Sequence, residues 1–171
     1  VIINNQNFNN QFQADGLISK NKNICIGVLT ADCCPIFIYD TANTFVSCIH
    51  SGWKGSYLNI IQNALKKIVK IQPNLDKVRA VIGPCLHKNN FEVDKNFITM
   101  FQKKESNNKC FFNNSSKKNS FYFDMKKLIK FQLKNNGILN VKDIDLDTYS
   151  NKKLFFSHRR SYHKNEVPTG R

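Results

Sequence analysis

The sequence has no long apolar run, few acidic residues and few histidines. No uncharged stretch approaches the roughly 20 apolar residues that cross a bilayer. Nothing in it has the charged, apolar and small-residue order of a secretory signal peptide. We therefore expect no membrane partner and a cytoplasmic location.

The sequence also lacks the cysteine pattern of a disulfide-bonded secreted protein. Of its six cysteines, four lie inside apolar runs with the composition of strands: Cys25, Cys33, Cys34 and Cys48. Neighbouring strand residues point to opposite faces, so Cys33 and Cys34 cannot share one environment. We expect reduced thiols, most of them small apolar side chains of a cytoplasmic protein.

Acidic residues are scarce: 12 Asp and Glu stand against 26 Lys and Arg, which gives a formal net charge of +14. Such an excess can mark a nucleic-acid-binding protein. Here the lysines are scattered among asparagines, as in "KNKN" and "FQLKNNG", and form no basic stripe interleaved with aromatic residues. We therefore expect a solvated basic surface rather than specific nucleic-acid binding. Its field would attract anions such as phosphate.

The composition that is present fits one globular domain, since 171 residues with 41% hydrophobic side chains can bury a sizeable core. Because the chain opens on Val1 rather than Met, we expect a fragment of a longer protein. Apolar runs rich in β-branched residues predict strands at 24–30, 34–40, 44–50, 77–83 and 141–149. Three- and four-residue apolar periods predict helices at 56–71, 91–101 and 124–137. The first twenty or so residues, 102–120 and the basic end of the chain are expected to be irregular. This mixture predicts an α+β fold with central sheets flanked by helices.

Two of the predicted strands form a hairpin, because only the turn-like "DTAN" separates them. Cys33 lies just before the first strand and His50 ends the second, so the two residues should lie side by side. His50 could activate Cys33 as a nucleophile. Alternatively, both could be ligands of a zinc ion, which in catalytic sites takes three protein ligands and keeps a position for water. The plain alternative is a buried thiol beside a histidine without chemistry.

Two further segments could bind an anion. "HSGWKGS" runs from a strand end into a helix start through two glycines, which would expose backbone N–H groups beside Lys54. In "HRR", Arg159 and Arg160 could hold a phosphate or carboxylate bidentately, or could be a solvated pair. We expect His158 and His163 to be exposed, and we see no partner for His87.

Taken together, these motifs resemble those of the laccase-domain family. "TADCCP", "HSGWKG", "IGPC" with "FEV", "FYFDM" and "FFSHRR" followed by "TGR" occur in that family's order and spacing, from Ala14 to Arg171. Its members were called multicopper polyphenol oxidases and are now regarded as purine nucleoside phosphorylases. The resemblance implies one domain over residues 1–171 with a fold similar to that of Cys/His deamidating toxins.

The resemblance also implies a zinc site. In the family, the residues that match Cys33 and His50 bind zinc, and a third histidine ligand comes from a motif before the Ala-Asp that reads Ala14-Asp15 here. No histidine precedes His50 in this sequence. We therefore expect that ligand upstream of this chain, and the family's closing strand beyond Arg171.

The implied activities are phosphorolysis of adenosine, inosine, guanosine and methylthioadenosine, and deamination of adenosine. Cys33 and His50 would be the catalytic metal site, and Lys54, Arg159 and Arg160 would hold phosphate. Three alternatives stay open. They are a cysteine hydrolase or amidase with a Cys33–His50 dyad, a copper-dependent polyphenol oxidase, and a binding module whose site has decayed. Copper is the weaker metal expectation, because several copper centres need more than four histidines.

Overall fold

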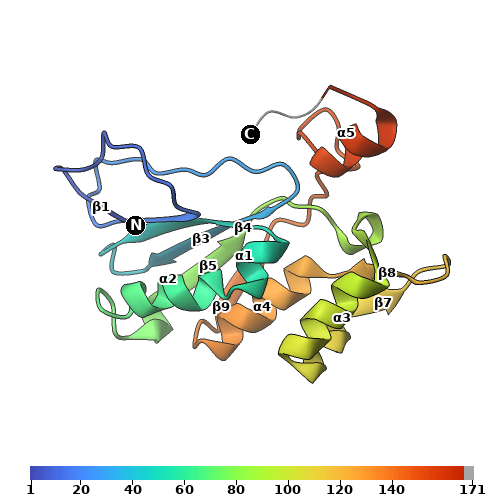
Figure 1. The fold of residues 1–171 in the computed structure, drawn as a ribbon. Helices are drawn as coiled ribbons and strands as arrows, with labels where there is room; N and C mark the ends of the chain where they lie inside the picture. The colour runs from blue at the N-terminus through green and yellow to red at the C-terminus, as the bar shows by residue number, and fades with distance from the viewer. Residues whose placement is uncertain (168–171) are drawn as a thin grey trace.

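The computed structural model describes residues 1–167 and contains two sheets with helices around them (Figure 1). The larger sheet has the order β1-β2-β4-β3-β5-β9 and the smaller one the order β6-β8-β7. The strands are β1 (Ile2–Ile3), β2 (Gly16–Ser19), β3 (Cys34–Asp40), β4 (Val46–Ser51), β5 (Val78–Ile82), β6 (Glu92–Asp94), β7 (Phe112–Asn114), β8 (Ser120–Phe123) and β9 (Asn140–Asp143). The α-helices are α1 (Trp53–Tyr57), α2 (Ile60–Ile68), α3 (Lys95–Lys104), α4 (Met125–Asn135) and α5 (His158–Lys164). Short 3-10 helices cover η1 (Leu75–Lys77), η2 (Lys88–Asn90) and η3 (Ser106–Phe111).

This architecture confirms the predicted α+β class. Helices α1, α2 and α4 lie along one face of the larger sheet, and α3 packs with the small sheet beside it (Figure 1). None of the helices in the described part of the chain is long and apolar enough to cross a membrane. The "TGR" that closes the last family motif, residues 169–171, lies outside the described residues.

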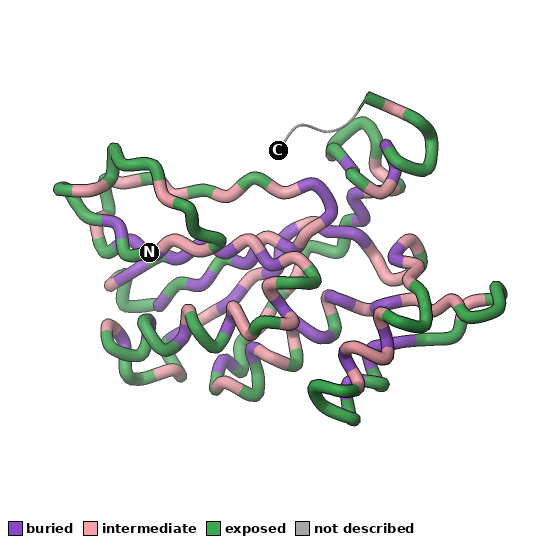
Figure 2. Tube along the Cα trace, viewed as in Figure 1, coloured by how far each residue is buried: buried purple, intermediate pink, exposed green. Residues whose placement is uncertain are grey.

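Buried and exposed side chains alternate along β3, so one face of this strand lies against the core. Ile36 and Ile38 are fully buried, whereas Phe37 and Tyr39 between them are exposed. The buried row packs against the helices, and Figure 2 shows buried segments running through the middle of the sheet. Successive strand residues point to opposite faces, so one face of β3 builds the core.

The predicted hairpin is confirmed, and it brings the candidate residues together. Strands β3 and β4 pair antiparallel, with Pro35 opposite His50. The buried carboxylate of Asp40 fixes the turn, since it accepts hydrogen bonds from the Thr44 backbone N–H at 2.7 Å and its hydroxyl at 3.0 Å. Cys34 is fully buried, as expected for a residue on the face opposite Cys33.

The prediction for the chain before β3 was wrong. Residues 24–30 form no strand, Leu29 is 91% exposed, and Cys25 is exposed rather than part of a core strand. The expected irregular arm instead contains β1 and β2. The reason is topological: a strand has two edges, and those of β4 are taken by β3 and β2. The apolar run at 24–30 therefore has no edge of β4 to pair with.

The predicted helix at 56–71 is two helices. Ser56, where the predicted helix begins, lies inside α1, and its hydroxyl is 2.9 Å from that of Ser51. Asn59 then takes a left-handed conformation with φ +60, which separates α1 from α2.

Other boundaries moved for local reasons. The predicted helix at 91–101 begins as β6, and α3 starts only after Asp94, whose carboxylate accepts from the Phe97 N–H at 2.8 Å. The expected loop at 102–120 contains η3 and β7, the last strand ends at Asp143, and the basic end contains α5. The helix at 124–137 is confirmed as α4, with Asp124 as its cap.

Candidate metal and nucleoside site

Cys33 and His50 meet at the end of the β3–β4 hairpin. Both side chains are partly buried. Contact with the Cys33 sulfur and a hydrogen bond with Asp15 raise the pKa of His50 to about 9, against the opposite effect of burial. The structure therefore brings together the two residues on which both the zinc and the dyad hypotheses rest.

Asp15 fixes the orientation of the His50 ring. Its Oδ1 lies 3.0 Å from His50 Nδ1, and its carbonyl oxygen accepts from the His50 backbone N–H at 2.7 Å. The second ring nitrogen, Nε2, faces the same space as the Cys33 sulfur. A carboxylate on the far nitrogen is the usual arrangement of a metal-binding histidine.

The Cys33 sulfur and the His50 Nε2 atom both lie close to Gly52. A Cβ placed on Gly52 would lie 2.9 Å from Cys33 Sγ and 4.0 Å from His50 Nε2. The backbone of Gly52 is extended, with φ −82, so no left-handed conformation demands glycine here. This glycine of the "HSGWKG" motif instead leaves space for the sulfur.

The donor set fits part of a zinc site. A thiolate and an imidazole are zinc ligands, and catalytic zinc takes three protein ligands. Within residues 1–167 no group of three or more His, Cys, Asp or Glu side chains is placed to hold a metal ion. Cys33 and His50 are thus two side chains of the types that zinc accepts, and Asp15 lies behind His50.

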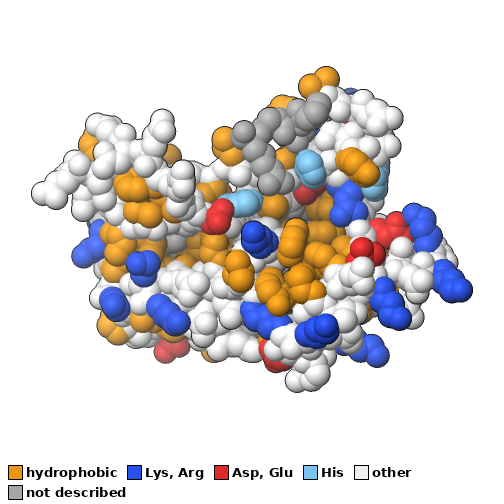
Figure 3. Space-filling model, in the orientation of Figure 1, with side chains coloured by type: hydrophobic (Ala, Val, Ile, Leu, Met, Phe, Trp, Pro, Cys, Tyr) orange, Lys and Arg blue, Asp and Glu red, His pale blue; other side chains and the backbone are white. Residues whose placement is uncertain are grey.

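A cleft of about 610 Å³ opens beside Cys33. Its walls are mainly aromatic and apolar, and they come from the β3 entrance, the segment before β6, and the elements α1, β6, α3, α4 and α5. The lining residues are Ala31, Asp32, Cys33, Trp53, Leu86, Phe91, Glu92, Val93, Asp94, Phe97, Met125, His158, Arg159, Tyr162 and His163. The rings of Trp53 and Phe97 meet edge to face at 5.3 Å. Figure 3 shows apolar side chains gathered on this side of the molecule, bordered by histidine and by charged side chains.

Arg159 lies in the cleft, and its guanidinium makes one hydrogen bond to the residues that the structure describes. Its Nη1 donates to the Glu92 carbonyl oxygen at 2.8 Å, and the group lies 5.3 Å from the Phe91 ring centre. Its Nε and Nη2 make no hydrogen bond within the described residues. Burial lowers the pKa of Arg159, while the charges of Asp32 and Glu92 oppose that effect.

Arg160 and Lys54 are not brought into this cleft. Arg160 is 4% exposed and donates to the carbonyl oxygens of Thr148, Tyr149 and Phe155. Its Nε bonds to Glu166 at 3.3 Å. Lys54 is exposed on α1 and lines no part of the cleft.

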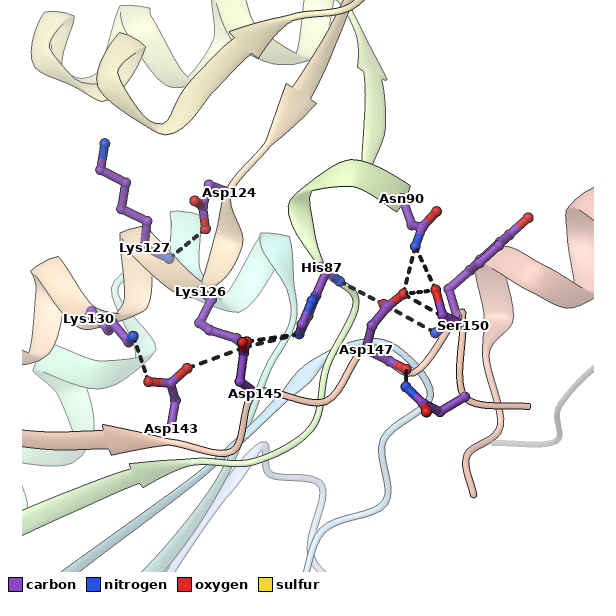
Figure 4. A network of polar contacts seen from close by, with 12 residues as sticks. His87, Asn90, Asp124, Lys126, Lys127, Lys130, Asp143, Asp145, Asp147 and Ser150 are labelled. Carbon is purple, nitrogen blue, oxygen red and sulfur yellow. Dashed lines mark hydrogen bonds and ion pairs between the residues drawn. The ribbon is translucent and has the colours of Figure 1, made fainter. Parts of the chain in front are cut away.

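His158 and His163 are exposed, as expected, yet they line the cleft. The expectation that His87 lacks a partner was wrong. Figure 4 shows its Nε2 beside the Lys126 amine and the Asp145 carboxylate, at 3.2 and 3.5 Å. Both partners are distant from His87 in sequence, in α4 and after β9, so no local pattern indicated them.

The sequence also gave no reason to single out Asp32, although it is part of the quoted "TADCCP" motif. It is 7% exposed, and its carboxylate accepts from the Thr148 hydroxyl and from the Arg159 backbone N–H. No local signal in the sequence connects it with those two residues.

Comparisons with known proteins show which family the chain resembles. The family model described as multi-copper polyphenol oxidoreductase laccase matches residues 1–171. A Rickettsia conorii protein named purine nucleoside phosphorylase RC0672 is 38% identical over 154 residues, which are 90% of this chain and 63% of that protein. The Campylobacter jejuni purine nucleoside phosphorylase Cj1217c is 38% identical over 94% of this chain and 66% of its own length.

A solved structure of Neisseria meningitidis protein NMB0706 matches with a TM-score of 0.76 and 27% identity, over 85% of this chain and 59% of that one. The chain thus spans somewhat less than two thirds of the curated relatives named above. The motif resemblance is confirmed: the chain belongs to the multi-copper polyphenol oxidoreductase laccase family.

Proposed function

We propose that this chain carries the greater part of a zinc-dependent purine nucleoside phosphorylase that also deaminates adenosine. The observation that supports this most is the position of the Cys33–His50 pair at the edge of an aromatic cleft that also holds Arg159. Relatives named purine nucleoside phosphorylase support the same substrate class. We further propose adenosine, inosine, guanosine and methylthioadenosine as its nucleosides.

The cleft has the chemistry that a nucleoside and phosphate require. A purine base would stack on the ring of Trp53, which is 40% exposed, with the edge-to-face ring of Phe97 beside it. The free N–H groups of Arg159 would donate to phosphate oxygens, a charge-assisted contact that suits a planar guanidinium. In phosphorolysis a phosphate oxygen bonds to the anomeric ribose carbon while the bond to the purine nitrogen breaks. Arg159 would hold the attacking oxygen in place.

Zinc held by Cys33 and His50 would supply a Lewis acid and an activated water. The role of Asp15 would be to keep the His50 ring in one orientation. We propose that the third ligand is a histidine from a segment preceding this chain. A cavity of about 870 Å³, lined by His50 and Asp15 among others, gives that segment room.

Lys54 and Arg160 were predicted to bind phosphate together with Arg159. We keep Arg159 as the main phosphate ligand and leave Lys54 as an outer charge that attracts anions. The role of Arg160 in phosphate binding stays a prediction, and its buried hydrogen bonds favour a structural role.

A second candidate is a cysteine hydrolase with a Cys33–His50 dyad. The contact between the two side chains and the raised pKa of His50 favour it, because an imidazolium stabilises a thiolate. We consider a copper oxidase and a decayed binding module weaker candidates.

We also propose a cytoplasmic location. The six cysteines are all free, which agrees with it.

The test is to follow adenine and inosine formed from adenosine, with and without phosphate, a chelator and a thiol-alkylating reagent. Phosphate-dependent adenine release that the chelator abolishes supports the zinc phosphorylase. Activity that survives the chelator and is lost on alkylation supports the dyad.

A further inference from the structure

Asp32 connects three distant parts of the chain. Its Oδ1 accepts from the Thr148 hydroxyl at 2.7 Å, and its Oδ2 accepts from the Arg159 backbone N–H at 2.6 Å. Its own carbonyl oxygen accepts from the Leu86 N–H at 2.9 Å. A single buried residue at the entrance of β3 is thus joined to the loop after β5, to the segment after β9 and to α5.

The bond to Arg159 is a helix cap provided from outside the helix. Ser157 precedes α5 and its hydroxyl accepts the Arg160 N–H at 3.1 Å, as an ordinary N-cap does. The N–H of Arg159 has no carbonyl partner inside α5, since it belongs to the first turn. The carboxylate of Asp32 takes this N–H, and its negative charge suits the positive end of the helix.

The backbone of Asp32 is held in an uncommon conformation. Its φ is +86, in the left-handed region that favours glycine. Such a conformation persists where the surrounding bonds fix it, and it often occurs beside functional sites. Here it directs the carboxylate towards α5, while the next residue, Cys33, contacts His50.

We propose that Asp32 is the positioning residue that sets the distance between the Cys33–His50 pair and the guanidinium of Arg159. This inference rests on the proposed function, in which the pair holds zinc and Arg159 holds phosphate. Asp32 does not act on the substrate. Its negative charge matters less than its two accepted hydrogen bonds, because those bonds dock α5 against the entrance of β3.

Three variants separate geometry from charge. Asp32→Ala removes both hydrogen bonds. Asp32→Asn can keep both, because its oxygen accepts from the Arg159 N–H and its amide donates to the Thr148 hydroxyl oxygen. Asparagine also tolerates the left-handed conformation. Thr148→Val removes one bond from a residue that does not line the cleft. Asp124→Ala is the matched control, since it deletes a capping carboxylate from α4 instead.

The first readout is amide hydrogen exchange in α5, which needs no activity. Asp32→Ala should speed exchange in α5 by about tenfold or more, as expected for the loss of a hydrogen bond to a charged group. Thr148→Val should have a smaller effect, and Asp32→Asn should stay near wild type. Asp124→Ala should change α4 and leave α5 as it was. If amides of α5 in Asp32→Ala exchange at the same rate as in the wild type, the proposal is wrong.

The second readout is phosphorolysis of adenosine at varied phosphate. Asp32→Ala should raise the KM for phosphate by about tenfold, and Asp32→Asn should restore it. If Asp32→Asn is as inactive as Asp32→Ala while its α5 exchange is normal, Asp32 acts on the reacting atoms and the positioning role is wrong. The kinetics use the chain joined to a preceding segment that completes the proposed zinc site. If this joined, zinc-loaded protein turns over no nucleoside, the proposed function fails, and the exchange measurement alone still decides whether Asp32 docks α5.

Discussion

Arg159 and Arg160 are neighbours in sequence, but their guanidinium groups lie in different surroundings. That of Arg159 faces the cleft with one hydrogen bond to Glu92, whereas that of Arg160 is buried among three backbone carbonyl groups and Glu166. Two consecutive residues of α5 therefore differ in role: the guanidinium of Arg159 faces the cleft, and that of Arg160 holds the C-terminal segment together.

Substituting these two arginines should give opposite results. Arg159→Gln should raise the KM for phosphate with little change in thermal stability. Arg160→Gln leaves several buried carbonyl groups unpaired and should lower the unfolding temperature by about 5–10 °C. Steady-state kinetics and thermal unfolding of both variants test this. Equal effects of the two substitutions on phosphate KM, at unchanged stability, would contradict the assignment.

The space at Gly52 offers a test of the metal site. In Gly52→Ala the new methyl group would lie 2.9 Å from the Cys33 sulfur and would displace it. We expect zinc affinity to fall by at least about tenfold, with the fold retained. Gly55→Ala is the matched control, because a Cβ there meets the Ile60 side chain at an ordinary van der Waals distance of 3.6 Å and lies away from the Cys33 sulfur. Competition with a chromogenic chelator measures both, and unchanged affinity in Gly52→Ala would exclude Cys33 as a ligand.

The stability of the protein should depend on the ionisation of Asp147. Burial alone would raise the pKa of this carboxyl group, but hydrogen bonds from Ser150, His87 and Tyr149 outweigh it and lower the pKa. A lowered folded-state pKa stabilises the protein above the unfolded-state pKa of about 3.9, and this contribution is lost as pH falls through the folded-state value.

The wild type should therefore lose more stability on acidification than Asp147→Asn does. Urea unfolding at pH values from about 6 down to 2 gives the two free-energy curves. Parallel curves over this range would show that Asp147 is not stabilising in its charged form.

The sequence was sufficient to predict the hairpin and the Cys33–His50 pair, because both depend on neighbouring apolar runs and one short turn. It was not sufficient for contacts between distant segments. Asp32 and Arg159 are 127 positions apart, and their hydrogen bond exists only because α5 folds back onto the entrance of β3. The wrong prediction of a strand at 24–30 has the same cause. The sequence did not show that β2 pairs with the edge of β4.

The proposed third ligand predicts that the chain alone binds zinc weakly. Joined behind the corresponding N-terminal segment of the Rickettsia conorii relative, of which it spans 63%, it should bind zinc at least about tenfold more tightly. If a histidine of that segment is the proposed third ligand, replacing it by alanine should remove the gain. Tight binding by the chain alone would mean that the described residues, or a second copy, complete the site.

The most direct measurement is the conversion of adenosine by this joined protein in phosphate buffer, with and without a chelator. We predict adenine release that depends on phosphate, stops when zinc is removed and returns when zinc is added back. Cys33→Ala and His50→Ala should abolish it. Adenine release that is insensitive to the chelator, or no turnover of any purine nucleoside by the zinc-loaded protein, would contradict a zinc-dependent phosphorylase.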